Sequence, residues 1–367
     1  MVALAWVGES MGETQSLRDL PSGTVANIAI ILMVSVLAII QLKAVIQPLV
    51  IATLLFLLIR PAAQWLEERP LMQKSYAHPL MPYGVLVALL FIVLWMASQV
   101  LYANLTAFTD EVPMLTEKLS EKVVWFEGIS LMGYSFDISG MTELFSVETI
   151  NEYIGDFVGS LASFTASAVT VLIFLLFIIL EAETLPRRLK AAFPEDATRI
   201  EGITSNAGEG INTYVVTRAT VAFGQAVIAG IVLWYLGVPG WFMWASITFM
   251  MDFIPYVGAL ISLIPPIFIG LIMLSSPQAI VLILILVANQ QAWGAVVEPQ
   301  LAGQRLDISP IVLLLLVAFW GWAWGIMGMV LGVPLAVIMK IALESDPRTR
   351  PIALLLSQNP KSQAAEE

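Results

Sequence analysis

Long apolar runs separated by short polar stretches dominate the chain. Such runs cover residues 22–42, 43–66, 82–101, 160–180, 215–236 and 278–297. A helix of roughly 20 apolar residues spans the hydrocarbon core of a bilayer, which is about 30 Å thick. The alternation of single apolar and polar residues that marks membrane β-barrels is absent from these runs. The pattern therefore predicts an all-α polytopic membrane protein.

Residues 241–274 form an apolar segment that does not fit a single crossing. Turn-forming Gly, Pro and Ser residues confine it on both sides. A continuous helix over this segment would be about 51 Å long, too long for one crossing and too short for two. Asp252, Pro255 and Gly258 interrupt its middle. We therefore expect two half-helices that meet at membrane depth.

Residues 311–343 present the same problem, and Gly325 and Gly328 interrupt them. The stretches 258–265 and 328–334 are weak copies of one another, because each begins with Gly and ends with Pro. Paired, interrupted apolar segments in corresponding positions indicate the binding site of a transporter. The sequence thus favours a transport function located in the second half of the chain.

Clusters of Arg and Lys predict the orientation in the membrane. Short basic loops stay in the cytoplasm, and such clusters occur in the loop 60–81 and after residue 181. We therefore expect both termini to be cytoplasmic. The chain has about six transmembrane helices if the two broken segments are re-entrant hairpins, and about eight if they are tilted spans. The hairpin version creates two units of opposite orientation, as in inverted-repeat transporters.

These elements predict the domain organisation of the chain. It comprises a cytoplasmic tail (1–22), three transmembrane helices (23–103), an acidic extracytoplasmic helical region (104–160), a fourth transmembrane helix (161–181), a cytoplasmic amphipathic region (182–214), a transport core with two broken hairpins (215–343) and a cytoplasmic tail (344–367).

The region 104–160 holds ten acidic residues and only two bases. Leu105, Phe108, Val112 and later apolar residues recur at steps of three and four, which lines one face of a helix. A second stripe follows at 150–164. The two stripes either bury each other as a small helical cap or bind neighbouring protomers.

Composition narrows the class of protein further. The chain is 59% hydrophobic and 12% charged, with a mean hydropathy of +0.86, which is too apolar for a soluble multidomain protein. Its net charge of -11 argues against a nucleic-acid partner. With no Cys and one His, we expect neither disulfides nor a metal site. No nucleotide-binding loop or catalytic triad is recognisable, so we predict no enzyme activity and no cofactor.

Five charged residues are candidates for chemistry. A carboxylate at the first break, Asp252, persists where it meets water, a cation or a donor. It either contacts a solute or ion, or caps the next half-helix. Glu298, Arg305 and Asp307 lie in one loop, where they form a gate or an ion pair that stabilises a turn. Arg218 lies near the inner end of its span, where snorkelling toward headgroups is the simplest interpretation.

Polar uncharged and backbone groups add further candidates. Asn289 and Gln290 interrupt an aliphatic span, so we expect their amides to face the bundle interior, as interhelical contacts or as solute contacts. Pro and Gly at the two breaks free backbone groups that can bind a solute. These residues are Pro255, Gly258, Gly325, Gly328 and Pro334.

Several motifs resemble the carboxyl-terminal signature of the autoinducer-2 exporter-like (AI-2E) transporter family. They are GQ at 224–225, LGVP at 236–239, IPYVG at 254–258, VVEPQLAG at 296–303 and FWGWAWG at 319–325. The resemblance implies an all-helical inner-membrane protein that forms homo-oligomers, with pentamers described for the family. It implies export of a small polar signalling molecule or, in some members, exchange of sodium ions for protons. The family often has Asn where this chain has Glu298, so a neutral-solute site does not carry over unchanged. Gln225 becomes a secondary site candidate.

The main prediction is a multi-pass secondary transporter of the inner membrane that exports a small polar, autoinducer-2-like solute. Its expected partners are the lipid bilayer, the solute, Na⁺ or H⁺, and further copies of the chain. Two alternatives stay open. One is a sodium/proton antiporter in which Asp252 and Glu298 titrate, and the other is a non-transporting scaffold that docks a partner through 104–160.

Overall fold

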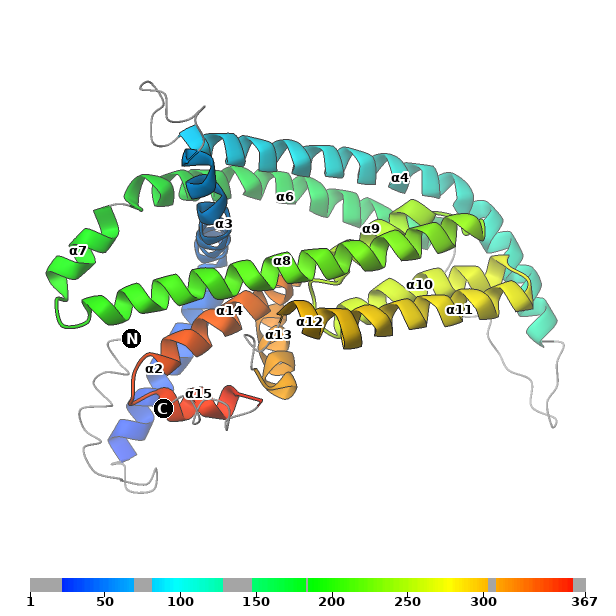
Figure 1. Cartoon of the computed structure of the whole chain (residues 1–367). Coiled ribbons are helices and arrows are strands. Elements are labelled where there is room, and N and C mark those ends of the chain that lie inside the picture. Colours follow the sequence, from blue (N-terminus) through cyan, green and yellow to red (C-terminus); the bar gives the residue numbers. More distant parts are fainter. Residues whose placement is uncertain (1–21, 69–80, 128–146, 183, 303–307, 359–367) are drawn as a thin grey trace. The chain divides into compact units, whose positions relative to one another are not determined.

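The computed structural model describes residues 22–68, 81–127, 147–182, 184–302 and 308–358, and this part of the chain contains helices but no strand (Figure 1). The helices are α2 (Ser22–Gln41), α3 (Lys43–Glu67), α4 (Met81–Glu127), α6 (Val147–Glu181), α7 (Thr184–Ala192), α8 (Ala197–Tyr235), α9 (Trp241–Met251), α10 (Val257–Met273), α11 (Ser276–Gln291), a π-helix (Ala292–Val297), α12 (Glu298–Ala302), α13 (Pro310–Trp324), α14 (Ile326–Glu344) and α15 (Arg350–Leu356). The prediction of an all-α protein is confirmed.

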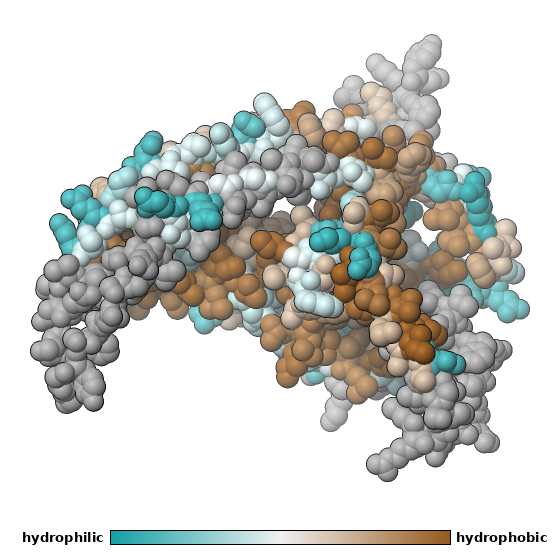
Figure 2. Space-filling view, turned by 180° about the vertical axis from the view of Figure 1, so that it is seen from behind, coloured by the Kyte–Doolittle hydropathy of each residue, from teal (hydrophilic) through white to brown (hydrophobic). Residues whose placement is uncertain are grey.

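Five helical stretches among the described residues are long and apolar enough to cross a membrane, and a bent pair, Ser167–Glu181 with Thr184–Ala192, adds a sixth if it counts as one span. In α4, six consecutive apolar residues from Phe91 to Met96 are exposed, which places apolar side chains all round the helix. Such a surface suits lipid rather than water. Hydrophobic residues also cover large areas of the face seen in Figure 2. These features confirm a polytopic membrane protein.

The chain divides into two compact units. One comprises Met1–Thr53, Thr184–Ala207 and Asp307–Glu367, and the other comprises Leu54–Glu183 and Gly208–Leu306. We call them the terminal unit and the central unit. The first broken segment belongs to the central unit and the second to the terminal unit, so each is described within its own unit.

The first broken segment forms a helical hairpin in the central unit. Helix α9 ends at Met251 and α10 begins at Val257. Thr248 of α9 and Pro266 of α10 line the same small cavity, which requires the chain to reverse at the break. At the reversal Gly258 packs so closely on the carbonyl group of Met251 that a Cβ atom would overlap it. The segment therefore folds back on itself instead of continuing as one tilted rod.

The second broken segment forms a corresponding hairpin in the terminal unit. Gly325 turns the chain with φ 69° between α13 and α14. Gly328 packs on the carbonyl group of Trp320 as Gly258 packs on that of Met251. Farther from the turn, a Cβ atom on Gly332 would lie 3.2 Å from Cα of Val317, so the two helices run back along each other. The predicted similarity of the two segments thus has a structural basis.

The first apolar stripe of the acidic region is buried against the first hairpin. Helix α4 runs without interruption from Met81 to Glu127, across the predicted start of that region at residue 104. Its Phe108 contacts Trp244 of α9 edge to face, with ring centroids 5.9 Å apart. Leu105, Val112 and Leu115 join the same core as Met243 and Leu282. The stripe therefore packs on the first hairpin, while the side chains of the second stripe, at 150–164, lie outside the described residues.

Candidate functional site

One face of α8 carries the polar side chains from which the site is built. Tyr214, Arg218 and Gln225 are four and seven residues apart, so they follow one another along the same side of the helix. Tyr214 is 5% exposed and Gln225 is 1% exposed. The side chain of Arg218 is 12% exposed and turns into the central unit. This position rules out the snorkelling interpretation of Arg218.

Arg218 holds three elements of the central unit together. Its Nε atom donates to the carbonyl oxygen of Asp252 at the break of the first hairpin. Its Nη1 atom donates to Oε2 of Glu298 at the start of α12, at 2.6 Å. Its Nη2 atom lies 3.7 Å from Oδ1 of Asp252. The rigid, planar guanidinium group suits this multiple contact, which a lysine cannot reproduce. We call these three residues the charged cluster.

Asp252 is almost fully enclosed. Its side chain is 3% exposed, and its Oδ2 atom accepts no hydrogen bond from any residue that the structure describes. Its N–H group donates to the carbonyl oxygen of Thr248, which continues the hydrogen bonding of α9 by one residue. Tyr256, and not Asp252, occupies the N-cap position of α10. Of the two predicted roles of Asp252, helix capping is therefore not observed.

Glu298 reaches Arg218 through an irregular piece of helix. The π-helix between α11 and α12 contains Trp293, whose indole ring occupies the space that a Cβ atom on Gly224 would need. Gly224 therefore lets the π-helix approach α8 closely. Glu298 follows directly after this π-helix, and short π-helical segments occur frequently at functional sites. The Glu298 side chain is 33% exposed, so it forms the open end of the charged cluster.

A small polar cavity lies farther along α8. It is lined by residues of α8, α9, α10 and α11 and has space for about one water molecule. Five of its nine lining residues are apolar, and we call it the polar cavity after the other four, which are Thr248, Ser262, Asn289 and Gln290. Asn289 is 9% exposed, and its Nδ2 atom donates to the carbonyl oxygen of Gln225, 3.1 Å away. The cavity and the charged cluster both include residues from the hairpin α9–α10.

The structure brings part of the predicted set together. Arg218, Asp252 and Glu298 form the charged cluster, Asn289 binds the backbone of Gln225, and Gln290 lines the cavity. Pro255 and Gly258 lie at the turn of the first hairpin, whereas Gly325, Gly328 and Pro334 belong to the second hairpin in the terminal unit. Arg305 and Asp307 lie outside the described residues.

Sequence reasoning missed several contributors to the site. Tyr214 donates to the carbonyl oxygen of Phe253 at 3.4 Å, next to the break. Thr248 and Ser262 line the cavity, and Trp293 positions the π-helix. A signal was available for Thr248, because it precedes Asp252 by one helical turn and therefore shares its face of α9.

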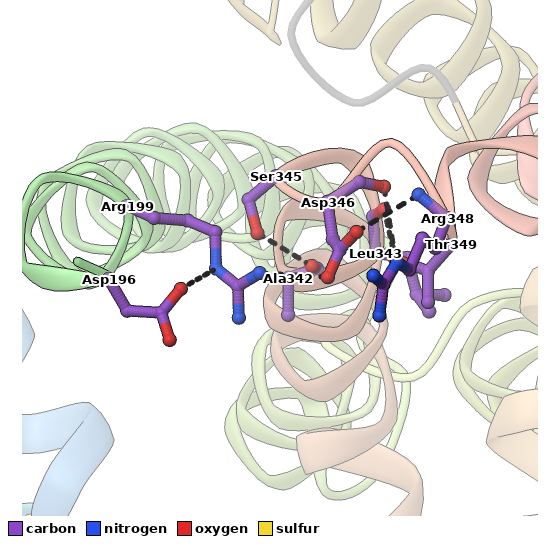
Figure 3. Close-up of polar contacts among 8 residues, drawn as sticks. All are labelled: Asp196, Arg199, Ala342, Leu343, Ser345, Asp346, Arg348 and Thr349. Atoms are coloured by element: carbon purple, nitrogen blue, oxygen red, sulfur yellow. Dashed lines mark hydrogen bonds and ion pairs between the residues drawn. The ribbon is translucent and has the colours of Figure 1, made fainter. Parts of the chain in front are cut away.

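A second group of charges stabilises the terminal unit. Arg199, near the start of α8, lies between Asp196 and Asp346, and its Nη1 atom is 2.8 Å from Oδ2 of Asp346 (Figure 3). The N–H group of Arg348 donates to Oδ1 of Asp346 at 2.9 Å. This backbone hydrogen bond, together with Arg199, holds the pKa of Asp346 below its ordinary value. The group ties the first turn of α8 to the segment after α14.

We expect the Asp346 carboxylate to stabilise the terminal unit at neutral pH but not at acidic pH. Because the pKa of Asp346 is lower in the folded protein than in the unfolded chain, its stabilisation is present at neutral pH and is lost as the pH falls below about 4. Asp346→Asn should therefore lower the free energy of unfolding at pH 7 by about 1 kcal/mol or less. Thermal unfolding of the unsubstituted protein and of Asp346→Asn at pH 7 and pH 3 measures the change in the free energy of unfolding. An equal change at both pH values would contradict the prediction.

The central unit combines spanning helices, a broken hairpin, a buried charged cluster and a polar cavity. Charged residues and opened helices at membrane depth are features of membrane transporters. The family comparison agrees, because the model described as "AI-2E family transporter" matches residues 28–347. The chain therefore belongs to the AI-2E transporter family, and the resemblance seen in its motifs is confirmed.

Individual relatives are similar over much of their length. YhhT of Escherichia coli (strain K12), whose name carries a provisional transport assignment, is 25% identical over 87% of this chain and 90% of its own length. A Haemophilus influenzae protein with the same kind of name is 27% identical over 77% of this chain and 84% of its own length. TqsA of Escherichia coli (strain K12), named an AI-2 transport protein, is 31% identical over 54% of this chain and 57% of its own length.

Proposed function

We propose that this protein is a secondary transporter that exports a small polar solute, of the kind that AI-2 represents, across the inner membrane. The observation that carries the proposal is the charged cluster. Arg218 connects α8, the break of the first hairpin and α12 through Asp252 and Glu298. Buried charges of this kind are costly at membrane depth, and they are typical of transport pathways.

The charged cluster suits a movable contact between helices. Glu298 is partly exposed whereas Asp252 is enclosed, so solvent can reach one end of the cluster. Release of Glu298 from Arg218 would free α12 and the π-helix from α8, while the backbone contact of Arg218 would still hold the hairpin. A solute that stabilises the released form would thereby change access to the cavity, which is the requirement of alternating access.

Efflux from proteoliposomes tests the proposed function. Purified full-length protein is reconstituted into vesicles preloaded with AI-2, and release is followed over time against protein-free vesicles. The proposal expects saturable release that depends on the protein and is lost in Glu298→Gln, in which the ion pair with Arg218 is broken. Release equal to that of protein-free vesicles would contradict the proposed transport of AI-2.

Exchange of sodium ions for protons is the second candidate function, and Asp252 is the observation that favours it. This carboxylate is buried, and its Oδ2 atom has no donor among the described side chains and backbone groups. A carboxylate that binds a proton and a cation in turn needs such a free oxygen atom. Under this function Asp252→Asn should abolish ion exchange in everted vesicles, because the amide can neither titrate nor neutralise a cation. Unaltered exchange would count against it.

The remaining expectations belong to the same proposal. We propose that both termini face the cytoplasm and that the chain assembles as a homo-oligomer, as the resemblance to the family implies. Exposed apolar residues such as Ile280 and Leu284 of α11 are available for contacts with lipid or with another copy. Cross-linking of the purified protein in lipid nanodiscs measures the number of copies.

A further inference from the structure

We infer that the polar cavity of the central unit is a subsite for one hydroxyl group of an uncharged, hydroxyl-bearing solute. This inference rests on the proposed transport function and specifies the class of solute. Three features of the cavity support this inference. They are its hydrogen-bonding groups, its uncharged lining residues and its small volume.

The two hydroxyl side chains of the cavity present oxygen atoms as acceptors. Thr248 donates its hydroxyl proton to the carbonyl oxygen of Trp244 at 2.9 Å, and Ser262 donates to that of Ala259 at 3.1 Å. Each hydroxyl group has one proton, which these bonds use, so its two lone pairs remain as acceptors. Both residues are 5% exposed, so no bulk water competes for these oxygen atoms.

Asn289 adds a third acceptor whose orientation is fixed. Its Nδ2 atom donates to the carbonyl oxygen of Gln225. The reverse orientation of the Asn289 amide would place its Oδ1 atom against that carbonyl oxygen, and two acceptors cannot form a hydrogen bond. The Oδ1 atom is consequently left buried and without a donor in the described part of the chain. A buried acceptor without a donor destabilises the site, and a donor from a ligand removes this penalty.

Gln290 supplies the complementary donor. Gln290 is a lining residue of the same cavity, and its side-chain amide carries two N–H groups as well as an oxygen atom. The lining therefore combines several acceptors with a donor. A hydroxyl group, which donates one hydrogen bond and accepts others, matches this combination.

The cavity discriminates against ionic ligands. A carboxylate or phosphate group would find no positively charged side chain among the lining residues. A cation would find no carboxylate among the lining residues. Desolvating an ion without a compensating charge is strongly unfavourable. Because the space holds about one water molecule, a single hydroxyl group also fits by size.

The test uses D-ribose as the uncharged probe and D-ribonate, which carries a carboxylate, as its charged counterpart. Saturable counterflow of each is measured in proteoliposomes of the full-length protein, together with uptake of ²²Na⁺. The variants Thr248→Val and Ser262→Ala each remove one acceptor and keep the shape of the side chain. We expect ribose but not ribonate to be carried, and each variant to raise the half-saturating ribose concentration about 3–10-fold.

Two controls carry the same chemical change outside the cavity. Thr220 on α8 and Ser246 on α9 also donate to a carbonyl oxygen of their own helix, and neither lines the cavity. Thr220→Val and Ser246→Ala should therefore leave ribose counterflow unchanged.

The outcomes separate the inference from the proposed function. Counterflow of ribose that Thr248→Val and Ser262→Ala leave unchanged would overturn the subsite but not the transporter. Preferred transport of ribonate, or uptake of ²²Na⁺ that ribose does not inhibit, would overturn the subsite in the same way. If none of the three probes moves while AI-2 is still released from the same proteoliposomes, the subsite is overturned and the transport function stands. If AI-2 is not released either, both are overturned.

Discussion

Replacing Arg218 by glutamine is expected to abolish measurable transport and to destabilise the protein. The change leaves Asp252 buried without a positive partner and frees Glu298 from α8. Breaking a buried ion pair by removing one partner costs about 3–5 kcal/mol, because an uncompensated charge stays in the interior. Thermal unfolding in detergent measures the loss of stability, and solute efflux from proteoliposomes measures the loss of transport.

Three further variants separate the charge of Arg218 from its shape. Arg218→Lys keeps the charge but loses the planar group that bonds Asp252 and Glu298 together, so we expect partial stability and little transport. The double variant of Arg218→Gln with Asp252→Asn removes the unpaired charge and should recover much of the stability, but not the transport. Lys43→Gln, which removes an exposed positive charge, should change neither. Full transport by Arg218→Gln would show that the charged cluster has no role in the pathway.

The sequence identifies the members of the charged cluster but not their pairing. Asp252 and Glu298 are conspicuous because each is a carboxylate beside an apolar segment. Their common partner is 34 residues from one and 80 residues from the other, and no local pattern links residues at such separations. Sequence reasoning instead considered Arg305, the nearest base along the chain, as the partner of Glu298 or Asp307, with a gate as the alternative. The packing of α8 against the hairpin decides the pairing.

Apolar patterns predict which face of a helix is buried, but not against what. The stripe that includes Leu105 and Phe108 was expected to pack on a second stripe in the acidic region or on another protomer. Its described residues pack on the first hairpin, because α4 continues as one helix from Met81 to Glu127, and the side chains of the second stripe lie outside the described residues. Pro113 lies inside α4 without ending it. Nothing in the period of the stripe distinguishes these partners.

Thr248 and Ser262 escaped sequence reasoning for a different reason. Each bonds a carbonyl group of its own helix, which is the ordinary way for a hydroxyl side chain to be accommodated in an apolar helix. Their proximity to Asn289 arises only because the hairpin places α9 and α10 beside α11. Amides are easier to notice, because an Asn-Gln-Gln sequence in an aliphatic span already requires partners.

Glycine at the turn of each hairpin is expected to be irreplaceable. A Cβ atom on Gly258 would overlap the carbonyl group of Met251, and one on Gly328 would overlap that of Trp320. Both obstacles are backbone groups, which cannot move aside as the end of a side chain can. Gly258→Ala and Gly328→Ala should therefore each force the helices of a hairpin apart, at a cost of about 1–3 kcal/mol or more. Thermal unfolding and solute efflux measure the effect.

The matched control for both variants is Gly84→Ala. Gly84 is also helical, but a Cβ atom there would meet nothing within 4 Å, so alanine should leave stability unchanged or raise it slightly. Gly258→Ala should also separate the backbone of Asp252 from Arg218, because the shifted residues include the turn between α9 and α10. Transport should consequently fall in Gly258→Ala even in the fraction of protein that remains folded. If Gly258→Ala and Gly84→Ala behave alike, the close backbone contact at the turn is not required, and the hairpin does not hold the charged cluster in place.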